Sequence, residues 1–388
     1  MERFDLPEGW EWHELHEVAT IDSRQVNPSG DPDATFNYIG MENIQPGTNQ
    51  LIEFQPSQGA SIQSNKNRFD QRHVLYGKLR PYLNKVHLPS FEGICSTDIL
   101  PLLPKSGVTT REYLGNYLRT PTVVEYTRSK MDGAKMPRLR SPDLRAMLIP
   151  IAPPHEQKRI VDCIEAQASR VEAIRKAQAH LVDEMRGTLT GYYAEITTNA
   201  DWKPLGEVAP QVRRAVSVQA GQCYSELGIR SFGKGTFHKP AITAEQLGSK
   251  RIFHIHPGDL IFNNVFAWEG AVAVVRPEDA GRVGSHRFIT CVPKPKVATS
   301  PFLYFHFTTE HGLHDLGDAS PGGAGRNRTL GLTKLAAIKV PVPDYDKQVV
   351  FARLWEKVQE MNRLQTELTA DLAAYVPALL AKAFRGEL

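Results

Sequence analysis

Trp12-x-x-Leu15-x-Glu17-Val18-Ala19 returns past the middle of the chain as Trp202-x-x-Leu205-x-Glu207-Val208-Ala209. A second pair of phrases, Ile149-Pro150-Ile151 and Val340-Pro341-Val342, matches at nearly the same offset of about 190 residues. The repeats of solenoid proteins are roughly 20 to 50 residues long, so one repeat of this size indicates two copies of a whole domain with its connector. We therefore expect one structural frame that occurs twice.

The bulk composition is that of an ordinary globular protein. Of the 388 residues, 41% are hydrophobic and 23% are charged, which excludes wholesale disorder and allows two or three domains. No apolar run reaches the 18 or so residues of a membrane span, and the first residues lack the order of a signal peptide, so we expect a cytoplasmic protein without membrane contact. The four cysteines form no Cys-x-x-Cys pair, which argues against a structural zinc site.

The texture of the sequence divides the chain into four parts. Residues 1–153 and 201–343 are rich in Pro, Gly, Asn and short apolar runs, which is typical of strands and turns. Residues 154–200 and 344–388 are dense in helix formers. We therefore expect two mixed α/β domains and two long helical spacers. The net charge is only +3, but residues 201–343 hold 17 Lys and Arg against 11 Asp and Glu, so the positive excess lies in the second domain.

Both helical stretches carry an apolar stripe in heptad spacing. Apolar stripes of this length must be buried against another element, so we expect the two helices to pair with each other. The alternative is that each helix packs on its own domain. About 30 paired residues at 1.5 Å each would make a spacer of about 45 Å. Pro377 is expected to bend the second helix and to leave residues 378–384 as a separate segment. Gln178 and Gln365 in the stripes either are tolerated polar residues or fix the register. The expected pairing residues are Ile164, Val171, Ile174, Leu181 and Met185 in the first helix and Val358, Met361, Leu368 and Leu372 in the second.

Three further phrases carry a resemblance to a known family. They are Gly77-Lys78-Leu79-Arg80-Pro81-Tyr82, Pro153-Pro154-x-Glu156-Gln157-Lys158-Arg159-Ile160-Val161 and Lys382-Ala383-Phe384-Arg385-Gly386-Glu387-Leu388. With them the chain resembles the specificity subunits of type I restriction-modification systems over essentially its full length. The resemblance implies two target-recognition domains of mixed α/β type, joined by two long helices that pair as an antiparallel coiled coil, with an internal pseudo-twofold repeat.

The resemblance also implies a function and a set of partners. Each recognition domain would read one half of a bipartite, asymmetric site in double-stranded DNA, and the helices would set the gap. Two adenine-methyltransferase (modification) subunits would dock beside the helices, and restriction helicase-nuclease subunits would join them. The chain itself would be non-catalytic and would bind no cofactor or metal, whereas S-adenosylmethionine, ATP and Mg are expected on the partner subunits.

The second copy departs from the family phrases in two places. Glu156-Gln157-Lys158 is replaced by Lys347-Gln348-Val349, which keeps only the glutamine in register, and residues 77–82 match residues 258–263 only loosely. Such divergence is what two different half-sites would demand. It leaves the DNA contacts of the second domain less well defined by sequence than those of the first.

Basic residues in glycine-containing loops are the candidates for DNA contact. Lys and Arg supply affinity through phosphates, and Arg and Asn have the geometry to read guanine and adenine edges. The loops at 133–140 and 322–328 fall at equivalent places in the two halves, and a solvated basic face is the alternative for each cluster. The candidate residues are Lys78, Arg80, Lys85, Lys135, Arg138 and Arg140 in the first domain and Arg230, Lys234, Arg326, Asn327 and Arg328 in the second.

Other functions have weaker support in the sequence. Pro142-Asp143 followed by Glu156-Gln157-Lys158 superficially spells a metal-dependent nuclease, but the second half loses the pattern. Residues 152–155, Ala-Pro-Pro-His, are wrong at both outer positions for an adenine methyltransferase, and no P-loop is present. A stand-alone nuclease or methyltransferase and a scaffold that binds protein rather than DNA remain the alternatives.

Overall fold

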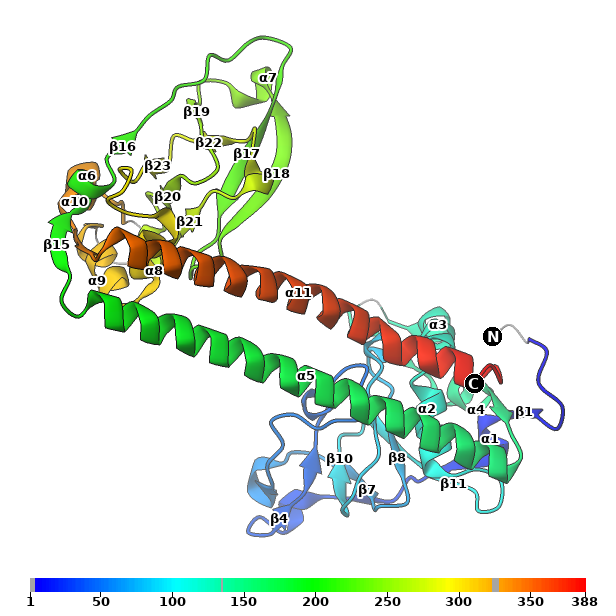
Figure 1. Ribbon diagram of the computed structural model, residues 1–388. Helices are drawn as coiled ribbons and strands as arrows, with labels where there is room; N and C mark the ends of the chain where they lie inside the picture. The colour runs from blue at the N-terminus through cyan, green and yellow to red at the C-terminus, as the bar shows by residue number, and fades with distance from the viewer. Residues whose placement is uncertain (1–3, 134, 323–327) are drawn as a thin grey trace. The chain divides into compact units, whose positions relative to one another are not determined.

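The computed structural model describes residues 4–133, 135–322 and 328–388 and divides into two compact units. Unit 1 consists of Met1–Ala177 with Thr366–Leu388, and unit 2 consists of Gln178–Gln365. Each unit therefore contains one strand-rich region and a part of both long helices (Figure 1). The predicted mixed α/β class, in two copies with two long helices, is confirmed. The four-part division of the chain stays a prediction.

Unit 1 is built on two four-stranded sheets with short helices beside them. Their main helices are α2 (Arg111–Leu118) and α3 (Pro121–Lys130), which start at the side-chain caps Thr110 and Thr120. The first sheet has the order β2 (Ala19–Ile21), β11 (Ile99–Pro104), β8 (Val74–Gly77) and β9 (Val86–His87). The second has the order β3 (Gln25–Val26), β7 (Lys66–Phe69), β10 (Gly93–Cys95) and β5 (Tyr38–Ile39).

Unit 2 repeats the first of these sheets strand for strand. Its helices are α8 (Ser300–Thr308), α9 (Glu310–Asp318) and α10 (Leu332–Ala337). One sheet has the order β16 (Gln211–Val212), β23 (Phe288–Cys291), β20 (Leu260–Asn263) and β21 (Val272–Val274). The other has the order β18 (Thr236–Thr243), β17 (Cys223–Ile229), β22 (Val283–Ser285) and β19 (Ile252–His254). The two units therefore share one strand order in the first sheet. They differ in the second sheet, where unit 2 has the additional edge strand β18.

The repeated phrases of the sequence pair with each other inside each unit. Strand β1 (Glu11–Glu14) runs antiparallel to β14 (Leu148–Ile151), with Trp12 opposite Pro150. Strand β15 (Asp201–Pro204) runs antiparallel to β24 (Lys339–Val342), with Trp202 opposite Pro341. The first and last phrases of each copy therefore close one region of chain into a loop that begins and ends at the same two-stranded ribbon.

The short helices after these strands anchor the cores. In α1 (Leu15–Val18) and α6 (Leu205–Val208) the apolar ends Leu15, Val18, Leu205 and Val208 are all at most 1% exposed. The Leu15 N–H donates to the Met147 carbonyl, and the Leu205 N–H donates to the Ile338 carbonyl, both at 2.8 Å. The repeated Leu-x-x-Val pattern is thus explained by burial on one face of a single helical turn.

Two long helices supply the rest of each core. Helix α5 runs from Pro154 to Thr197, and its first residue is a proline, which suits a first helical turn. Helix α11 runs from Tyr345 to Ala383 and passes through Pro377. None of the helices in the described parts of the chain combines the length and apolar character that a membrane crossing requires.

The expectation that Pro377 leaves a separate segment after it is wrong, because α11 continues to Ala383. The last turn is held by burial: Leu379, Leu380 and Phe384 are 8%, 1% and 2% exposed. Burial of each such side chain is worth about 1.5 to 3 kcal/mol, which together exceeds the roughly 3 kcal/mol cost of a proline inside a helix. The Phe384 ring also packs edge-on against two tyrosines, Tyr113 and Tyr117.

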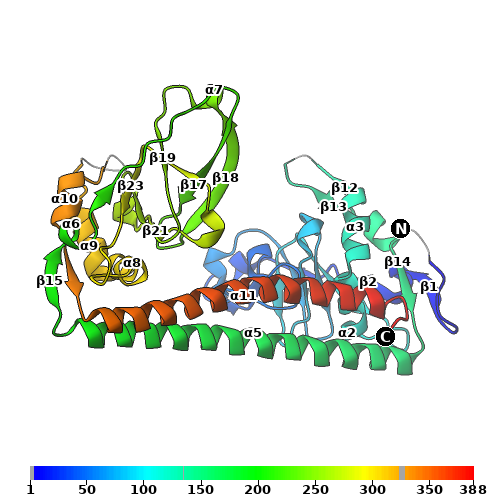
Figure 2. The same ribbon diagram turned by 45° about the horizontal axis from the view of Figure 1, so that its top comes forward.

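Within each unit the two long helices lie side by side (Figures 1 and 2). In unit 1 the Tyr375 hydroxyl donates to Gln167 Oε1 at 3.3 Å, and Arg159 Nη2 donates to the carbonyl of Leu388, which sets an antiparallel direction. In unit 2 the rings of Tyr193 and Phe351 pack with centroids 6.2 Å apart. The helices thus pair with each other and also pack on the strand-rich regions, so both alternatives raised by the apolar stripes occur together.

The predicted pairing residues differ in their burial. Three of them are exposed, since Ile174, Leu181 and Leu368 have exposed fractions of 43%, 42% and 39%. Two helices alone cover a seam residue from one side, and full burial needs a third wall from a strand-rich region. The apolar stripe therefore does not form one continuous buried seam. The residues that are buried are Ile164, Val171, Val358 and Leu372, and those that are half-buried are Met185 and Met361.

Candidate nucleic-acid interface

In unit 1 a basic hairpin packs against the segment that follows the central strand β8. The hairpin consists of β12 (Met131–Asp132) and β13 (Arg138–Leu139) and lies beside α3 (Figure 2). The Leu139 N–H donates to the Lys78 carbonyl at 2.9 Å, and the Arg80 N–H donates to the Pro137 carbonyl at 2.7 Å. The structure therefore brings together two stretches that the sequence named separately as candidates for DNA contact.

Arg80 is held in an unusual backbone conformation at this junction. Its φ of +48° lies in the left-handed region, which a non-glycine residue adopts at a cost of order 1 to 3 kcal/mol. The following Pro81 and the bond to Pro137 hold it there and leave its side chain exposed. Arg138 and Arg140 are also largely exposed and are oriented by carboxylates, with Nε to Oδ distances of 2.9 Å to Asp98 and 2.8 Å to Asp143.

Lys85 differs from the other predicted residues of this group. Its Nζ donates to the Met41 carbonyl, and partial burial lowers the pKa of its ammonium group. Its positive charge is therefore directed into the unit rather than toward solvent. Lys135 is exposed in the hairpin loop, and Lys78 is half-buried. Contact of these side chains with DNA stays a prediction.

Unit 2 repeats one backbone hydrogen bond of this junction with different side chains. The Leu330 N–H donates to the Asn264 carbonyl at 2.7 Å, as Leu139 does to Lys78 in unit 1. Arg328 lies with its guanidinium carbon 5.2 Å from the centre of the Trp268 ring, on the short helix η5 (Ala267–Glu269). Arg326 and Asn327, two predicted DNA contacts, lie outside the described residues.

The sequence alignment of the two central phrases needs correction. Strand β8 ends at Gly77 and strand β20 ends at Asn263, so Lys78 corresponds to Asn264. The match of residues 77–82 to residues 258–263 is therefore wrong by about five positions. It arose because a glycine was matched to a glycine, whereas Gly258 lies in the turn before its strand.

A second segment of unit 2 converges on η5. The turn between β17 and β18 contains Arg230 and Lys234, and its Phe232 N–H donates to the Glu269 carbonyl at 2.7 Å. Arg230 Nη1 donates to the Thr236 carbonyl, and the guanidinium lies over a ring of β18. Sequence reasoning named the two basic residues but missed Phe232 and Trp268; a phenylalanine among glycines was the available signal for the former.

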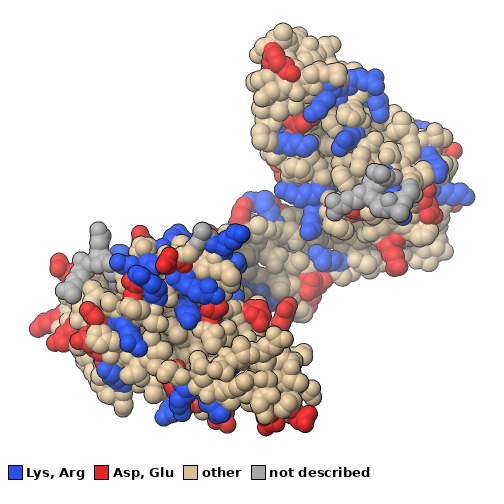
Figure 3. Space-filling view, turned by 180° about the vertical axis from the view of Figure 1, so that it is seen from behind, with Lys and Arg blue, Asp and Glu red and all other residues tan. Residues whose placement is uncertain are grey.

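On the face drawn in Figure 3, Lys and Arg side chains form clusters on each unit, with acidic side chains among and around them. This distribution is the electrostatic pattern expected of a surface that meets phosphates. The overall net charge of +3 does not reveal these basic clusters, because acidic residues elsewhere in the chain offset their positive charge.

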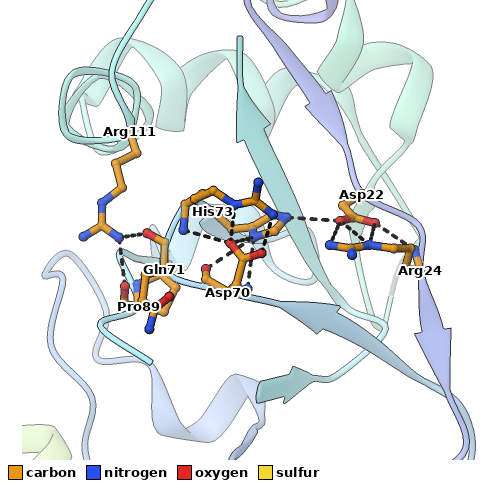
Figure 4. Close-up of polar contacts among 8 residues, drawn as sticks. Asp22, Arg24, Asp70, Gln71, His73, Pro89 and Arg111 are labelled. Atoms are coloured by element: carbon orange, nitrogen blue, oxygen red, sulfur yellow. Dashed lines mark hydrogen bonds and ion pairs between the residues drawn. The ribbon is translucent and has the colours of Figure 1, made fainter. Parts of the chain in front are cut away.

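A compact ionic cluster is built on the β7–β8 turn, residues 70–73 (Figure 4). The fully buried His73 ring places Nδ1 3.0 Å from Asp70 Oδ1 and Nε2 3.2 Å from Asp22 Oδ2. Each carboxylate also holds an arginine, with Nη2 of Arg24 2.6 Å from Asp22 and Nη2 of Arg72 2.7 Å from Asp70. The Arg24 and Arg72 side chains are 60% and 68% exposed, so the cluster presents two oriented cations to solvent.

Asp22 → Asn is expected to lower the free energy of unfolding by about 2 kcal/mol at pH 7. The hydrogen bond from Arg24, opposed by burial, lowers the pKa of Asp22 from 3.8 to about 2. Because the pKa is lowered on folding, this stabilisation is present above pH 3.8 and is lost as the pH falls toward 2. Urea unfolding at pH 7 and near pH 3 measures the difference, with Asp33 → Asn on the exposed surface as control. An equal loss at both pH values would contradict the assignment.

Comparison with known proteins identifies relatives for part of the sequence and for the whole fold. Residues 7–181 match the family model described as the type I restriction modification DNA specificity domain. The type I restriction enzyme EcoDI specificity subunit of Escherichia coli is 26% identical over 200 residues, which cover 48% of this chain and 44% of the relative. The EcoAI specificity subunit of the same organism is 24% identical over 210 residues, which cover 48% and 34%. The matched region thus spans less than half the length of either curated relative.

Solved structures match the fold over its whole length. A chain from a study of complex assembly and conformational transition of the type I R-M system superimposes with a TM-score of 0.70, at 23% identity and with 100% of both chains covered. The HsdS subunit from Thermoanaerobacter tengcongensis gives a TM-score of 0.57 at 22% identity, with 99% of both chains covered. Residues 7–181 are therefore similar to the type I restriction modification DNA specificity domain, and over its full length the chain shares the fold of these solved structures.

Proposed function

We propose that the chain is the DNA sequence-specificity subunit of a type I restriction-modification complex, in which each strand-rich region reads one half of a bipartite, asymmetric site. One observation carries the proposal. The same backbone hydrogen bond is made by the residue that follows the central strand in both units, where Lys78 accepts from Leu139 in one and Asn264 accepts from Leu330 in the other. A common frame with different exposed side chains is what two readers of unlike half-sites require.

The chemistry of the exposed side chains supports contact with duplex DNA. Lys and Arg neutralise phosphates and provide most of the affinity, whereas a few donors and acceptors at base edges provide the choice of sequence. In unit 1 Arg138 and Arg140 are each oriented by a carboxylate while largely exposed. An oriented guanidinium loses less conformational entropy on binding and can present two parallel donors to a guanine.

The partners and the division of labour are part of the same proposal. Two adenine-methyltransferase subunits dock on the long helices and the adjacent regions, and restriction helicase-nuclease subunits complete the complex. Those subunits carry S-adenosylmethionine, ATP and Mg, while this chain carries no catalytic group. The carboxylates of the nuclease-like pattern support this reading, since Asp143 is paired with Arg140 and Glu156 with Arg159.

Exchange of residues 133–140 for an unrelated loop of equal length is expected to change one half of the recognised site and to leave the other half intact. The reason is that the hairpin belongs to unit 1, and its junction with Lys78 and Arg80 lies within that unit. Sequencing of methylated adenines in cells that express the complete complex measures both halves at once. A control exchange of residues 218–221, an exposed turn of unit 2, leaves the first half unchanged. A change in both halves would contradict the assignment of one unit to one half-site.

A further inference from the structure

The β17–β18 hairpin of unit 2 ends in a turn that exposes an aromatic ring. Phe232 is 74% exposed, the largest fraction among the exposed large hydrophobic side chains of the described residues. A single exposed apolar side chain needs no explanation by itself. This one is also held in a strained backbone conformation, and the two observations together call for a function.

The backbone at Phe232 is strained and is fixed from several sides. Its φ of +61° lies in the left-handed region, where a bulky residue is a genuine outlier. The N–H groups of Phe232 and Gly233 donate to the carbonyls of Glu269 and Gly270 at 2.7 Å and 3.0 Å. The Tyr304 hydroxyl donates to the Gly233 carbonyl at 2.7 Å. The ring is therefore presented to solvent by a rigid turn, and strain of this kind is concentrated at functional sites.

The surroundings of the ring suit a nucleic acid. The sequence contains no Asp or Glu between Glu226 and Glu245, while it contains Arg230, Lys234 and Lys239. Lys234 Nζ lies 5.9 Å from the centre of the Phe232 ring. A Cβ atom added at Gly235 would meet nothing within 4 Å, so a ligand can approach the backbone closely there. An exposed ring with a lysine beside it, in a turn whose own residues include no acid, suits contact with a base step and its flanking phosphate.

The hairpin is also a local difference between the two units. In unit 1 the central strand β10 pairs in parallel with β5, and in unit 2 the central strand β22 pairs in parallel with β17. Strand β17 continues into β18, whereas β5 ends its sheet. The Phe232 turn therefore belongs to the part of the frame that distinguishes the second reader from the first.

We propose that Phe232 is an apolar wedge that inserts at a base-pair step of the half-site bound by unit 2 and unstacks that step. The inference rests on the proposed function and adds a residue that determines specificity through DNA deformation. Apolar side chains that enter between base pairs kink the duplex, and flexible pyrimidine–purine steps accept them at the lowest cost. Lys234, beside the ring, and Arg230, at the start of the same turn, contact the flanking phosphates.

The test uses the full chain with a duplex that carries the recognised site, found by sequencing of methylated adenines, with 2-aminopurine at successive adenine positions of the half-site. 2-Aminopurine brightens when its base is unstacked. The wild-type chain is expected to raise the fluorescence at one position. Phe232 → Ala is expected to abolish that rise and to weaken binding about tenfold, the scale of a lost stacking contact. Phe232 → Leu keeps part of both effects, and Leu332 → Ala, another exposed apolar residue of unit 2, behaves as the wild type.

Phe232 → Gly separates a wedge from a structural residue. Glycine adopts a φ of +61° without strain, so the midpoint of thermal unfolding is expected to rise while DNA binding falls. A residue that served only to stabilise the turn would instead lower the midpoint when it is replaced. Such a lower midpoint, together with unchanged DNA binding in Phe232 → Gly, would overturn the inference.

The proposed function and the wedge are contradicted by different results. If the wild-type chain does not prefer the site duplex over an unrelated duplex, the proposed function fails. If it does prefer the site, but Phe232 → Ala leaves affinity and fluorescence unchanged, only the wedge is overturned. If the same variant instead loses a protein partner during purification while it binds DNA normally, the ring serves a protein interface and the wedge is again overturned.

Discussion

Replacement of Gln157 by leucine is expected to lower the free energy of unfolding by roughly 3 kcal/mol. Gln157 is 2% exposed and lies in the first turn of α5. Its Nε2 donates to the carbonyls of Val108 and Ala152, both at 2.9 Å, and its Oε1 accepts from the Thr109 hydroxyl at 3.2 Å. Leucine fills a similar volume but removes the donor that these two carbonyls share, and the Thr109 hydroxyl is left only with its longer bond to the Thr110 carbonyl. Each carbonyl left without a donor costs about 1 to 3 kcal/mol, which gives roughly 3 kcal/mol for the two.

The second copy contains the same device and provides a second measurement. Gln348 is fully buried, and its Nε2 donates to the carbonyls of Val297 and Pro343 at 3.0 Å and 2.8 Å. Its Oε1 accepts from the Thr299 N–H at 3.1 Å. In both units one side chain ties the start of a long helix to the end of the preceding strand and to a loop. Gln348 → Leu is therefore expected to destabilise unit 2 by a similar amount.

Urea unfolding followed by circular dichroism measures both variants. Lys158 → Leu is the matched control, because it places the same residue one position further along the same helix, where the side chain is exposed and pairs only with Asp162. A surface ion pair of this kind contributes less than about 1 kcal/mol. Because the two glutamines lie in different units, their effects are expected to add in the double variant. A loss below about 1 kcal/mol in Gln157 → Leu would contradict the role of the three bonds.

The glutamines show how much of the fold could be predicted from sequence. The repeat, the proline stop at the start of α5 and the helical texture after it were sufficient to predict two copies with two long helices. The sequence also showed that the second copy keeps this glutamine, whereas its two neighbours are replaced by Lys347 and Val349. Its three partners could not be predicted, because two of them lie about 50 residues earlier in the chain.

The sequence predicted only part of the candidate interface. The physical reason why the rest was missed differs from residue to residue. The loops at 133–140 and 322–328 were expected at equivalent positions, because glycines and basic residues recur there at a nearly constant offset. Lys85 was grouped with the exposed cations, but its direction depends on the Met41 carbonyl, which periodicity does not encode. Phe232 was missed because exposure and a positive φ are properties of the folded turn rather than of the residue type.

Of the sequence signals, the heptad stripe was the poorest guide to which side chains are buried. It predicted helices and their pairing, yet it also placed Ile174, Leu181 and Leu368 in a buried seam, and these residues are exposed. A heptad shows which face of a helix is apolar. It does not show where along the helix a third layer is available to complete the cover.

Insertion of four residues into both α5 and α11, after Ala177 and before Thr366, is expected to lengthen the unread gap of the recognised site. These are the two points at which the chain passes from one unit to the other. Four helical residues add about 6 Å, and one base pair spans about 3.4 Å, so a gain of about two base pairs is expected while both half-sites stay the same.

Sequencing of methylated adenines in cells that express the complex measures the gap and both half-sites together. The same four residues inserted into the exposed turn at 219–221 form the control, because this turn lies within unit 2 and leaves both helices unchanged. An insertion into α5 alone shifts the pairing of Gln167 with Tyr375 and of Tyr193 with Phe351 relative to each other, so it is expected to impair methylation instead of lengthening the gap. Retained methylation with an unchanged gap in the double insertion would exclude the helices as the element that measures the distance between the half-sites.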